Sequence, residues 1–199
     1  MGDFTFWKDL VVETVKSPRT AAERILALDL PRTALWQMLA LEIILSLMLT
    51  QLAGAITPGG TEAFMPIDMS NPIIAVVFIG AMTVFLVLLV HRIGLLFGGQ
   101  GTFEGALRLV VWQQWVVLLL QAAQLLSLVL VPPLAWLIGL GSYGLTLWLL
   151  TNFIAALHGF RSRLAVFAGV LFTGMLFAFF LLFVLQLFGL LPPMEMTHV

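Results

Sequence analysis

Among the polar side chains that lie inside largely apolar stretches of the chain, six have chemistry that could serve a function. One is a carboxylate and five are amides: Glu42, Gln113, Gln114, Gln121, Gln124 and Asn152. A carboxylate surrounded by hydrocarbon is costly, so such a group usually faces protein or water, and it often relays protons or binds an ion. With a rotation of about 100° per residue, the four glutamines fall on one arc of a helix. The pattern predicts an intramembrane polar cluster.

Two interpretations of this cluster are open. In the first, the cluster lines a polar half-channel or a binding pocket that opens to the cytosol. In the second, the amides form hydrogen bonds between helices, worth about 0.6–2 kcal/mol each, and Glu42 is protonated or bonded to an amide. The second interpretation is favoured, because the sequence shows neither broken helices near the midplane nor paired repeats, which are typical of transporters.

Other residue types argue against an enzyme. His91 and His158 could bind a metal or a pigment, but isolated histidines at a membrane edge more often serve as hydrogen-bond donors, and no His and Glu pair has the spacing of metal ligands. The chain has no cysteine and no Gly-x-Ser-x-Gly nucleophile elbow. The glycine-rich segment 98–101 does not match a phosphate-binding loop. We therefore expect no enzymatic activity, no metal and no cofactor.

Small residues recur within the two apolar stretches nearest the C-terminus. Such residues allow two helix backbones to approach closely in a membrane. The expected helix-packing face consists of Gly139, Ala165, Gly169, Gly174 and Ala178. This face could pack within the protein's own helical bundle or against another protein, and packing within the bundle is favoured.

The elements that would position all these residues are membrane-spanning helices. Of 199 residues, 61% are hydrophobic and only 10% are charged, against about 25% charged in ordinary soluble domains. The mean hydropathy is +1.11. The sequence predicts an all-α polytopic membrane domain over 34–199, and the net charge of −1 argues against nucleic-acid binding. Five stretches are long enough to cross a hydrocarbon core of about 30 Å, and they lie at about 34–56, 72–97, 103–131, 134–157 and 164–190.

Residues 1–33 precede the first expected span and predict interfacial amphipathic helices. An apolar face recurs there at helical spacing and consists of Phe4, Trp7, Val11 and Val15. Ser17 and Pro18 then indicate the N-cap and the first residue of a second short helix. Five basic and five acidic side chains balance in this segment. We therefore expect it to hold on to a membrane surface or a partner by apolar contact, and not as a polybasic anchor.

The positions of the basic residues predict an orientation. Five of the nine Lys and Arg residues precede the first expected span, and the others flank the connections after the second and fourth spans: Arg92, Arg108, Arg161 and Arg163. Lys and Arg are enriched in cytosolic loops. We therefore expect a cytosolic N-terminus and a C-terminus on the opposite side of the membrane.

Short glycine-containing segments give the chain a family resemblance. One is GGQGTF at 98–103, followed by Leu107 and Arg108, and another is ALHGF at 156–160, followed by Arg163 and Ala165. With these segments the chain resembles the bacterial branch of the Yip family of Rab-interacting membrane proteins. Five spans and a cytosolic N-terminus match the architecture of that family, so the resemblance covers nearly the whole chain. It implies a multi-pass protein of the bacterial inner (plasma) membrane without catalytic residues.

The preferred functional hypothesis is a non-enzymatic membrane protein that acts as a scaffold or an accessory subunit. Its partners would be membrane lipids and other membrane proteins, or a second copy of itself. The alternative is a small transporter or channel for an ion, a proton or a lipid that uses Glu42 and the glutamine face of the third span. A third possibility is a lipid-handling protein, which would need a lipid-sized groove between spans.

Overall fold

The computed structural model describes residues 4–57 and 71–187, and within these ranges it contains helices and no strand. Two short helices come first and five long ones follow: α1 Phe4–Lys16, α2 Pro18–Ala27, α3 Arg32–Ile56, α4 Pro72–Leu96, α5 Phe103–Leu130, α6 Pro132–His158 and α7 Arg163–Leu187. The five long helices, α3 to α7, have the length and hydropathy of membrane spans. The predicted all-α fold with five spans is therefore confirmed, and the expected residues 188–190 of the last span lie outside the described ranges.

Local sequence explains where several of these helices begin. Asn71 caps α4, because its side chain accepts hydrogen bonds from the backbone N–H groups of Ile73 and Ile74. Thr102 caps α5 in the same way through the N–H of Gly105. Ser17 precedes α2 but makes no capping hydrogen bond with its side chain, so α2 begins with the fixed backbone angle of Pro18 alone.

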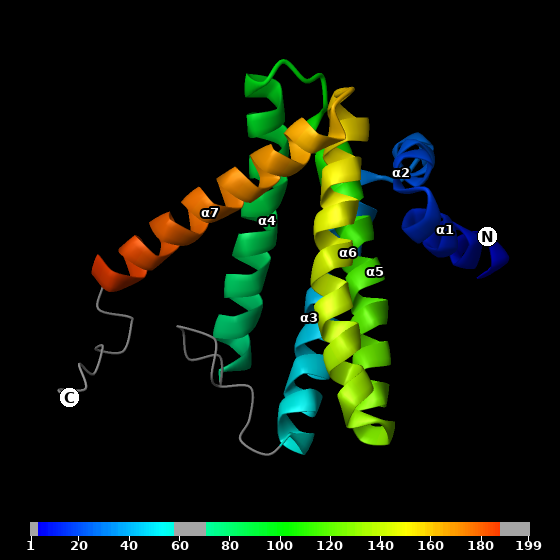
Figure 1. The fold of residues 1–199 in the computed structure, drawn as a ribbon, viewed down its shortest axis with the longest axis vertical. Coiled ribbons are helices and arrows are strands. Elements are labelled where there is room, and N and C mark those ends of the chain that lie inside the picture. The colour runs from blue at the N-terminus through cyan, green and yellow to red at the C-terminus, as the bar shows by residue number, and fades with distance from the viewer. Residues whose placement is uncertain (1–3, 58–70, 188–199) are drawn as a thin grey trace.

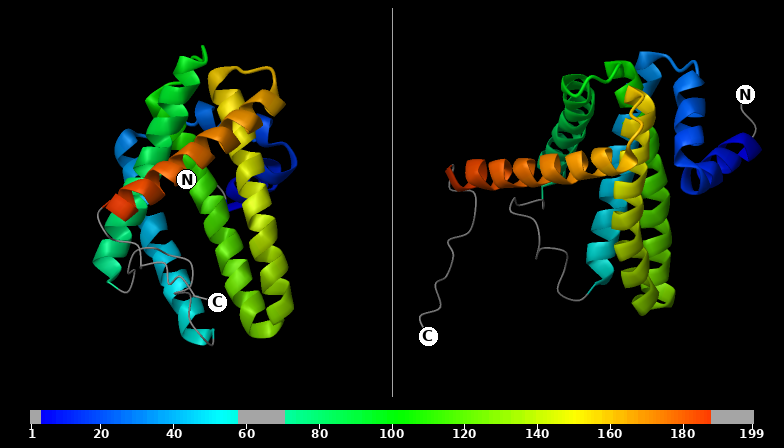
Figure 2. Two further views of the ribbon diagram at one scale, coloured as in Figure 1. Left: turned by 60° about the vertical axis from the view of Figure 1, so that its left-hand side comes forward. Right: turned by 45° about the horizontal axis from the view of Figure 1, so that its top comes forward.

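Helices α3 to α6 run side by side, and α5 lies at the centre, where it contacts α2, α3, α4 and α6. The connections from α4 to α5 and from α6 to α7 lie at the same end of this bundle, at the top of Figure 1. We call this the basic end, because the Arg residues of the bundle belong to the helix ends and connections there. Helix α7 starts at the basic end and then runs away from the other helices, so that its far end lies apart from α5 and α6 (Figures 1 and 2).

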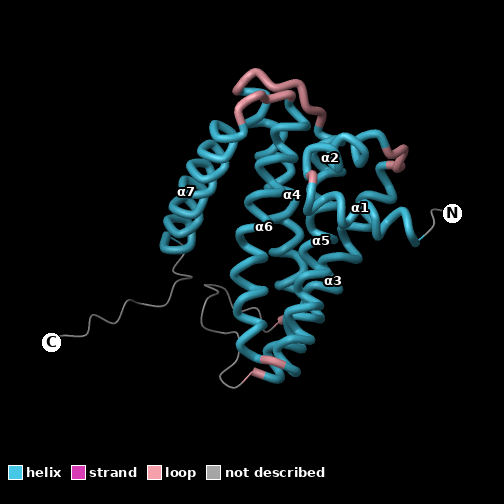
Figure 3. Tube along the Cα trace, turned by 45° about the vertical axis from the view of Figure 1, so that its right-hand side comes forward, coloured by secondary structure: helices cyan, strands magenta, loops and turns pink. Residues whose placement is uncertain are grey.

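Helices α1 and α2 form a pair that packs on the outside of α5 and α6, near the basic end (Figure 3). An ion pair between Glu13 and Arg24 joins the two short helices. The apolar cluster beneath them contains Leu10, Ala21, Ala22 and Ile25 from the pair, and Leu109, Trp112, Val116, Leu149 and Phe153 from the bundle. A second cluster fills the space between α3, α4 and α5.

The apolar face expected on α1 divides between the protein and its surroundings. Trp7 and Val11 are half-buried in the cluster described above, and the Trp7 ring stacks on Trp112 with 5.8 Å between ring centroids. Phe4 and Val15 are exposed. The α1–α2 pair therefore uses part of this face to bind its own bundle, and Phe4 and Val15 remain available for a membrane surface.

One hydrogen bond fixes α1 in the apolar surroundings of this contact. The indole Nε1–H of Trp112 donates to Thr14 Oγ1 at 2.9 Å, and the same hydroxyl donates to the carbonyl of Leu10 at 2.7 Å. Thr14 is fully buried. Since a buried indole N–H without an acceptor is costly, the Thr14 hydroxyl specifies how α1 lies against α5.

We predict that Thr14→Val loosens the α1–α2 pair. Valine keeps the shape of threonine but removes the acceptor, so the buried N–H of Trp112 loses its partner at a cost of about 1–3 kcal/mol. The measurement is trypsin cleavage at Lys8 and Lys16 in detergent, which we expect to accelerate. Thr20→Val, at an exposed position on α2, is the matched control. Equal cleavage rates for the two variants would contradict the prediction.

Candidate functional site

A buried polar group lies at the basic end of the bundle, around the imidazole of His158. This residue ends α6 and is 4% exposed. Three glycines surround its ring: Gly94 on α4, and Gly99 and Gly101 in the connection between α4 and α5. A Cβ atom at any of the three would lie within 3.0 Å of the ring, which real Cβ atoms essentially never do. The glycines are therefore required by the close approach of the histidine.

Hydrogen bonds occupy both nitrogens of the His158 ring. The backbone N–H of Gly101 donates to Nδ1 at 3.1 Å, so Nδ1 carries no proton. Nε2 lies 3.1 Å from the carbonyl of Val90 and must donate to it. The imidazole is thus neutral, with its proton on Nε2, and neither nitrogen is free to bind a metal.

His91 holds the same connection from the other side. Its Nδ1 lies 3.1 Å from the carbonyl oxygen of Gly101, which can only accept, so His91 donates. The N–H and the C=O of Gly101 are thus bonded to two different histidines. We call His91, Gly94, Gly99, Gly101 and His158 the glycine–histidine cluster. Both histidines donate a hydrogen bond, as expected, and His158 also accepts one.

The glycine–histidine cluster joins the two sequence segments that carry the family resemblance. The segment 98–103 contributes Gly99 and Gly101, and the segment 156–160 contributes His158. Sequence reasoning identified each segment but not their contact. The signal that could have found it is the combination of three glycines with a histidine at another helix end, since a glycine-lined space accommodates a planar ring.

The six polar residues expected to form a cluster have different neighbours. Gln121 Oε1 accepts from the hydroxyl of Ser46 on α3 at 2.9 Å, whereas Gln113 Nε2 donates to the carbonyl of Thr146 on α6 at 3.4 Å. Gln124 packs against Gly139 of α6. Gln121 and Gln113 therefore bond α5 to two different neighbours, α3 and α6, as interhelical hydrogen bonds would.

The remaining three residues show no bond to a glutamine among the described residues. Glu42 is 4% exposed, and its Oε2 is buried without a hydrogen-bond partner. Asn152 donates to the carbonyl of Trp148 in its own helix at 2.7 Å, and its Oδ1 is buried without a partner. Gln114 is half-buried.

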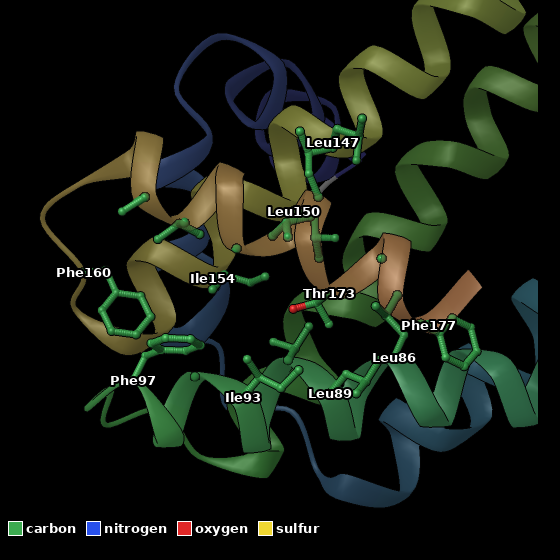
Figure 4. Close-up of a pocket in the computed structure, with 18 of the residues that line it drawn as sticks. Leu86, Leu89, Ile93, Phe97, Leu147, Leu150, Ile154, Phe160, Thr173 and Phe177 are labelled. Atoms are coloured by element: carbon green, nitrogen blue, oxygen red, sulfur yellow. The ribbon is translucent and has the colours of Figure 1, made fainter. Parts of the chain in front are cut away.

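An apolar groove of about 720 Å³ lies between α4, α6 and α7. Phe97 and Phe160 lie at one end of the groove, near the basic end of the bundle, and Leu86 and Phe177 lie at the other (Figure 4). Of the expected helix-packing face, Ala165, Gly169 and Gly174 line this groove. Around Gly169 and Gly174 a Cβ atom would find open space. These small residues thus border a groove and not a closely packed helix.

A smaller, polar pocket of about 430 Å³ lies on the outer side of the glycine–histidine cluster. Its main polar residue is Arg108, which donates to the carbonyl of Leu26 at 2.6 Å and pairs with Glu104 at 3.3 Å. These contacts tie α5 to the end of α2. The charged groups of this pocket therefore help to fix α2 beside the glycine–histidine cluster.

Comparison with known proteins gives one family. The family model described as Yip1 domain matches residues 12–185. Searches of curated proteins and of solved structures gave no significant match. The matched range covers helices α2 to α6 completely, together with the glycine–histidine cluster and the groove.

We predict that Gly99→Ala destabilises the bundle by about 1–3 kcal/mol, because the added methyl group overlaps the buried His158 ring. Thermal unfolding in detergent measures the effect. Gly141→Ala is the matched control, since a Cβ there meets nothing within 4 Å and alanine favours a helix over glycine by up to about 1 kcal/mol. In the double variant Gly99→Ala/His158→Gly the whole side chain that the methyl group would meet is absent, its Cβ atom included, so the two effects should be smaller than additive. Strict additivity would contradict the proposed contact.

Proposed function

The chain belongs to the Yip1 domain family, and we propose that it is a non-enzymatic membrane protein that acts as a scaffold or an accessory subunit through contacts between its helices and those of other membrane proteins. We further propose that the membrane is the inner membrane of a bacterium and that the N-terminus is cytosolic. The observation that carries the scaffold proposal is the position of α7.

Helix α7 packs on α6 near its start and touches α4 through Phe177, whose ring lies 4.9 Å from that of Phe85 between centroids. Beyond this contact the helix diverges from the other described helices (Figure 2), and Leu185 is its one buried residue within 178–187. Its distal part exposes Ala178 and three phenylalanines, Phe179, Phe180 and Phe183, which are each more than 60% exposed. Close packing against another helix would give these side chains the van der Waals contacts that hold membrane helices together.

The polar residues support a structural function more than a chemical one. The nitrogens of His158 are bonded to backbone groups, and Gln113 and Gln121 bond neighbouring helices. None of the six expected cluster residues lines the apolar groove or the polar pocket. The alternative of an ion or proton path through Glu42 therefore receives no support from either cavity.

The orientation proposal rests on the basic end. Arg32, Arg92, Arg108, Arg161 and Arg163 all belong to helix ends or connections at this end of the bundle. The opposite end includes the junction of α5 and α6, where residues 131–133 carry no charge. Under the positive-inside rule this asymmetry favours a cytosolic basic end.

We predict that a photoreactive benzoylphenylalanine at Phe180 forms a discrete protein adduct in the native membrane. The same group at Leu126 of α5 is the control, because both positions are similarly exposed, at 62% and 64%. Two differently tagged copies of the chain distinguish a second copy from another protein as the adduct. If both positions yield lipid adducts alone, α7 has no protein partner and the scaffold proposal fails.

Accessibility to a membrane-impermeant maleimide tests the orientation. The chain has no cysteine, so single variants need no prior substitution. In intact cells we expect Val131→Cys, between α5 and α6, to react and Gln100→Cys, between α4 and α5, to stay unlabelled until the cells are opened. Both residues are exposed on the protein surface. The reverse labelling pattern would place the N-terminus outside.

A further inference from the structure

We propose that the groove between α4, α6 and α7 binds one acyl chain of an anionic phospholipid, with the lipid phosphate held by Arg161 at the basic end. The scaffold proposal concerns the distal part of α7, and this inference concerns the proximal part. The two can therefore fail separately.

The chemistry of the groove suits an acyl chain. Its walls are aliphatic and aromatic side chains from α4, α6 and α7, with Ser162 and Thr173 as uncharged polar exceptions. The volume of about 720 Å³ lies within the range of about 300–1,000 Å³ that is typical of ligand sites in proteins. A saturated chain has no polar atom that would be left without a partner there.

The length of the groove matches the thickness of the hydrocarbon layer in one leaflet of the bilayer. Along α4 and its C-cap the wall runs from Leu86 to Phe97, which is 12 residues and a rise of roughly 16 Å. Half of a hydrocarbon core of about 30 Å is roughly 15 Å. A lipid whose headgroup lies at the basic end would thus place its chain along the groove down to about the bilayer midplane.

The single charge of the groove lies where the headgroup would be. Arg161 is the one charged residue among those lining the groove, and it belongs to the connection between α6 and α7 with Ser162. Among the described residues, none of the ion pairs involves Arg161. A guanidinium and a neighbouring hydroxyl can together bind a phosphate oxygen pair, and basic residues next to a membrane span favour anionic lipids.

The groove is also open toward the membrane. Leu171 and Met175 of α7 line it and are 45% and 51% exposed. Gly169 and Gly174 also line the groove and project no side chain into the space. A lipid can therefore enter sideways from the bilayer, without passage through water.

The test uses the full chain, purified in a non-ionic detergent, and native mass spectrometry with dioleoyl phosphatidylglycerol and dioleoyl phosphatidylcholine. We expect one phosphatidylglycerol molecule to bind more tightly than phosphatidylcholine. Gly169→Leu should weaken binding of both lipids by about tenfold or more, because the added side chain fills the groove. The matched control is Gly144→Leu, which adds the same side chain in open space outside the groove.

Arg161→Gln should reduce phosphatidylglycerol binding by about fivefold and abolish the preference over phosphatidylcholine. Arg163→Gln, an exposed neighbour that does not line the groove, is the control. Wild-type affinity in Gly169→Leu, or an unchanged preference in Arg161→Gln, would overturn the proposal.

A second measurement needs no variant. Phosphatidylglycerol with a diazirine on one acyl chain is cross-linked to the wild-type protein, and the modified peptides are mapped. Adducts concentrated in 86–97 and 165–177 would support the groove. Adducts distributed over the other exposed faces, such as 126–137, would show annular lipid only and overturn the inference.

Discussion

The structure depends on one buried imidazole at the place where four helix ends meet. His158 ends α6, bonds the carbonyl of Val90 in α4, and bonds the N–H of Gly101 just before α5. Since α7 begins five residues later, the ring also fixes where the last helix starts. The imidazole accepts a hydrogen bond at one nitrogen and donates one at the other. It fills a space that is open because three glycines surround it. A positively charged ring could not accept from Gly101, so the arrangement requires the neutral form.

The same end of the bundle carries the other contacts that position helices. Arg108 bonds the carbonyl of Leu26 in the last turn of α2, and Trp112, one turn further along α5, bonds Thr14 of α1. The N-terminal pair is therefore packed against the bundle, and Phe4 and Val15 remain exposed. Away from this end, the helices present large apolar side chains outward, as helices surrounded by lipid do. Specific polar contacts are thus concentrated at one end of a largely apolar bundle.

Sequence reasoning predicted the elements well and the contacts between them poorly. Helices of 25 to 28 mostly apolar residues and the caps at Asn71 and Thr102 depend on local structure, which the hydrophobic pattern and the capping residues encode directly. The partner of His158 could not be predicted, because the ring and its glycines are separated by more than 50 residues. The open groove beside Gly169 could not be predicted either, since a small residue permits close packing but does not require it. The apolar face of α1 shows the same limit. The helical spacing identified the apolar residues of this face, but the position of Trp112 on α5 determines which of them are covered.

The connection between α6 and α7 has a thermodynamic consequence. Only four residues, 159–162, join the two helices, and Gly159 adopts φ of 72°, a conformation that other residues rarely adopt. The angle at which α7 leaves this joint determines both the width of the groove and the position of the helix's distal part. Occupancy of the groove and attachment of a neighbour at the distal part would therefore be linked equilibria, in which each must change the affinity of the other by the same factor. Through this joint, the lipid composition of the bilayer would regulate assembly.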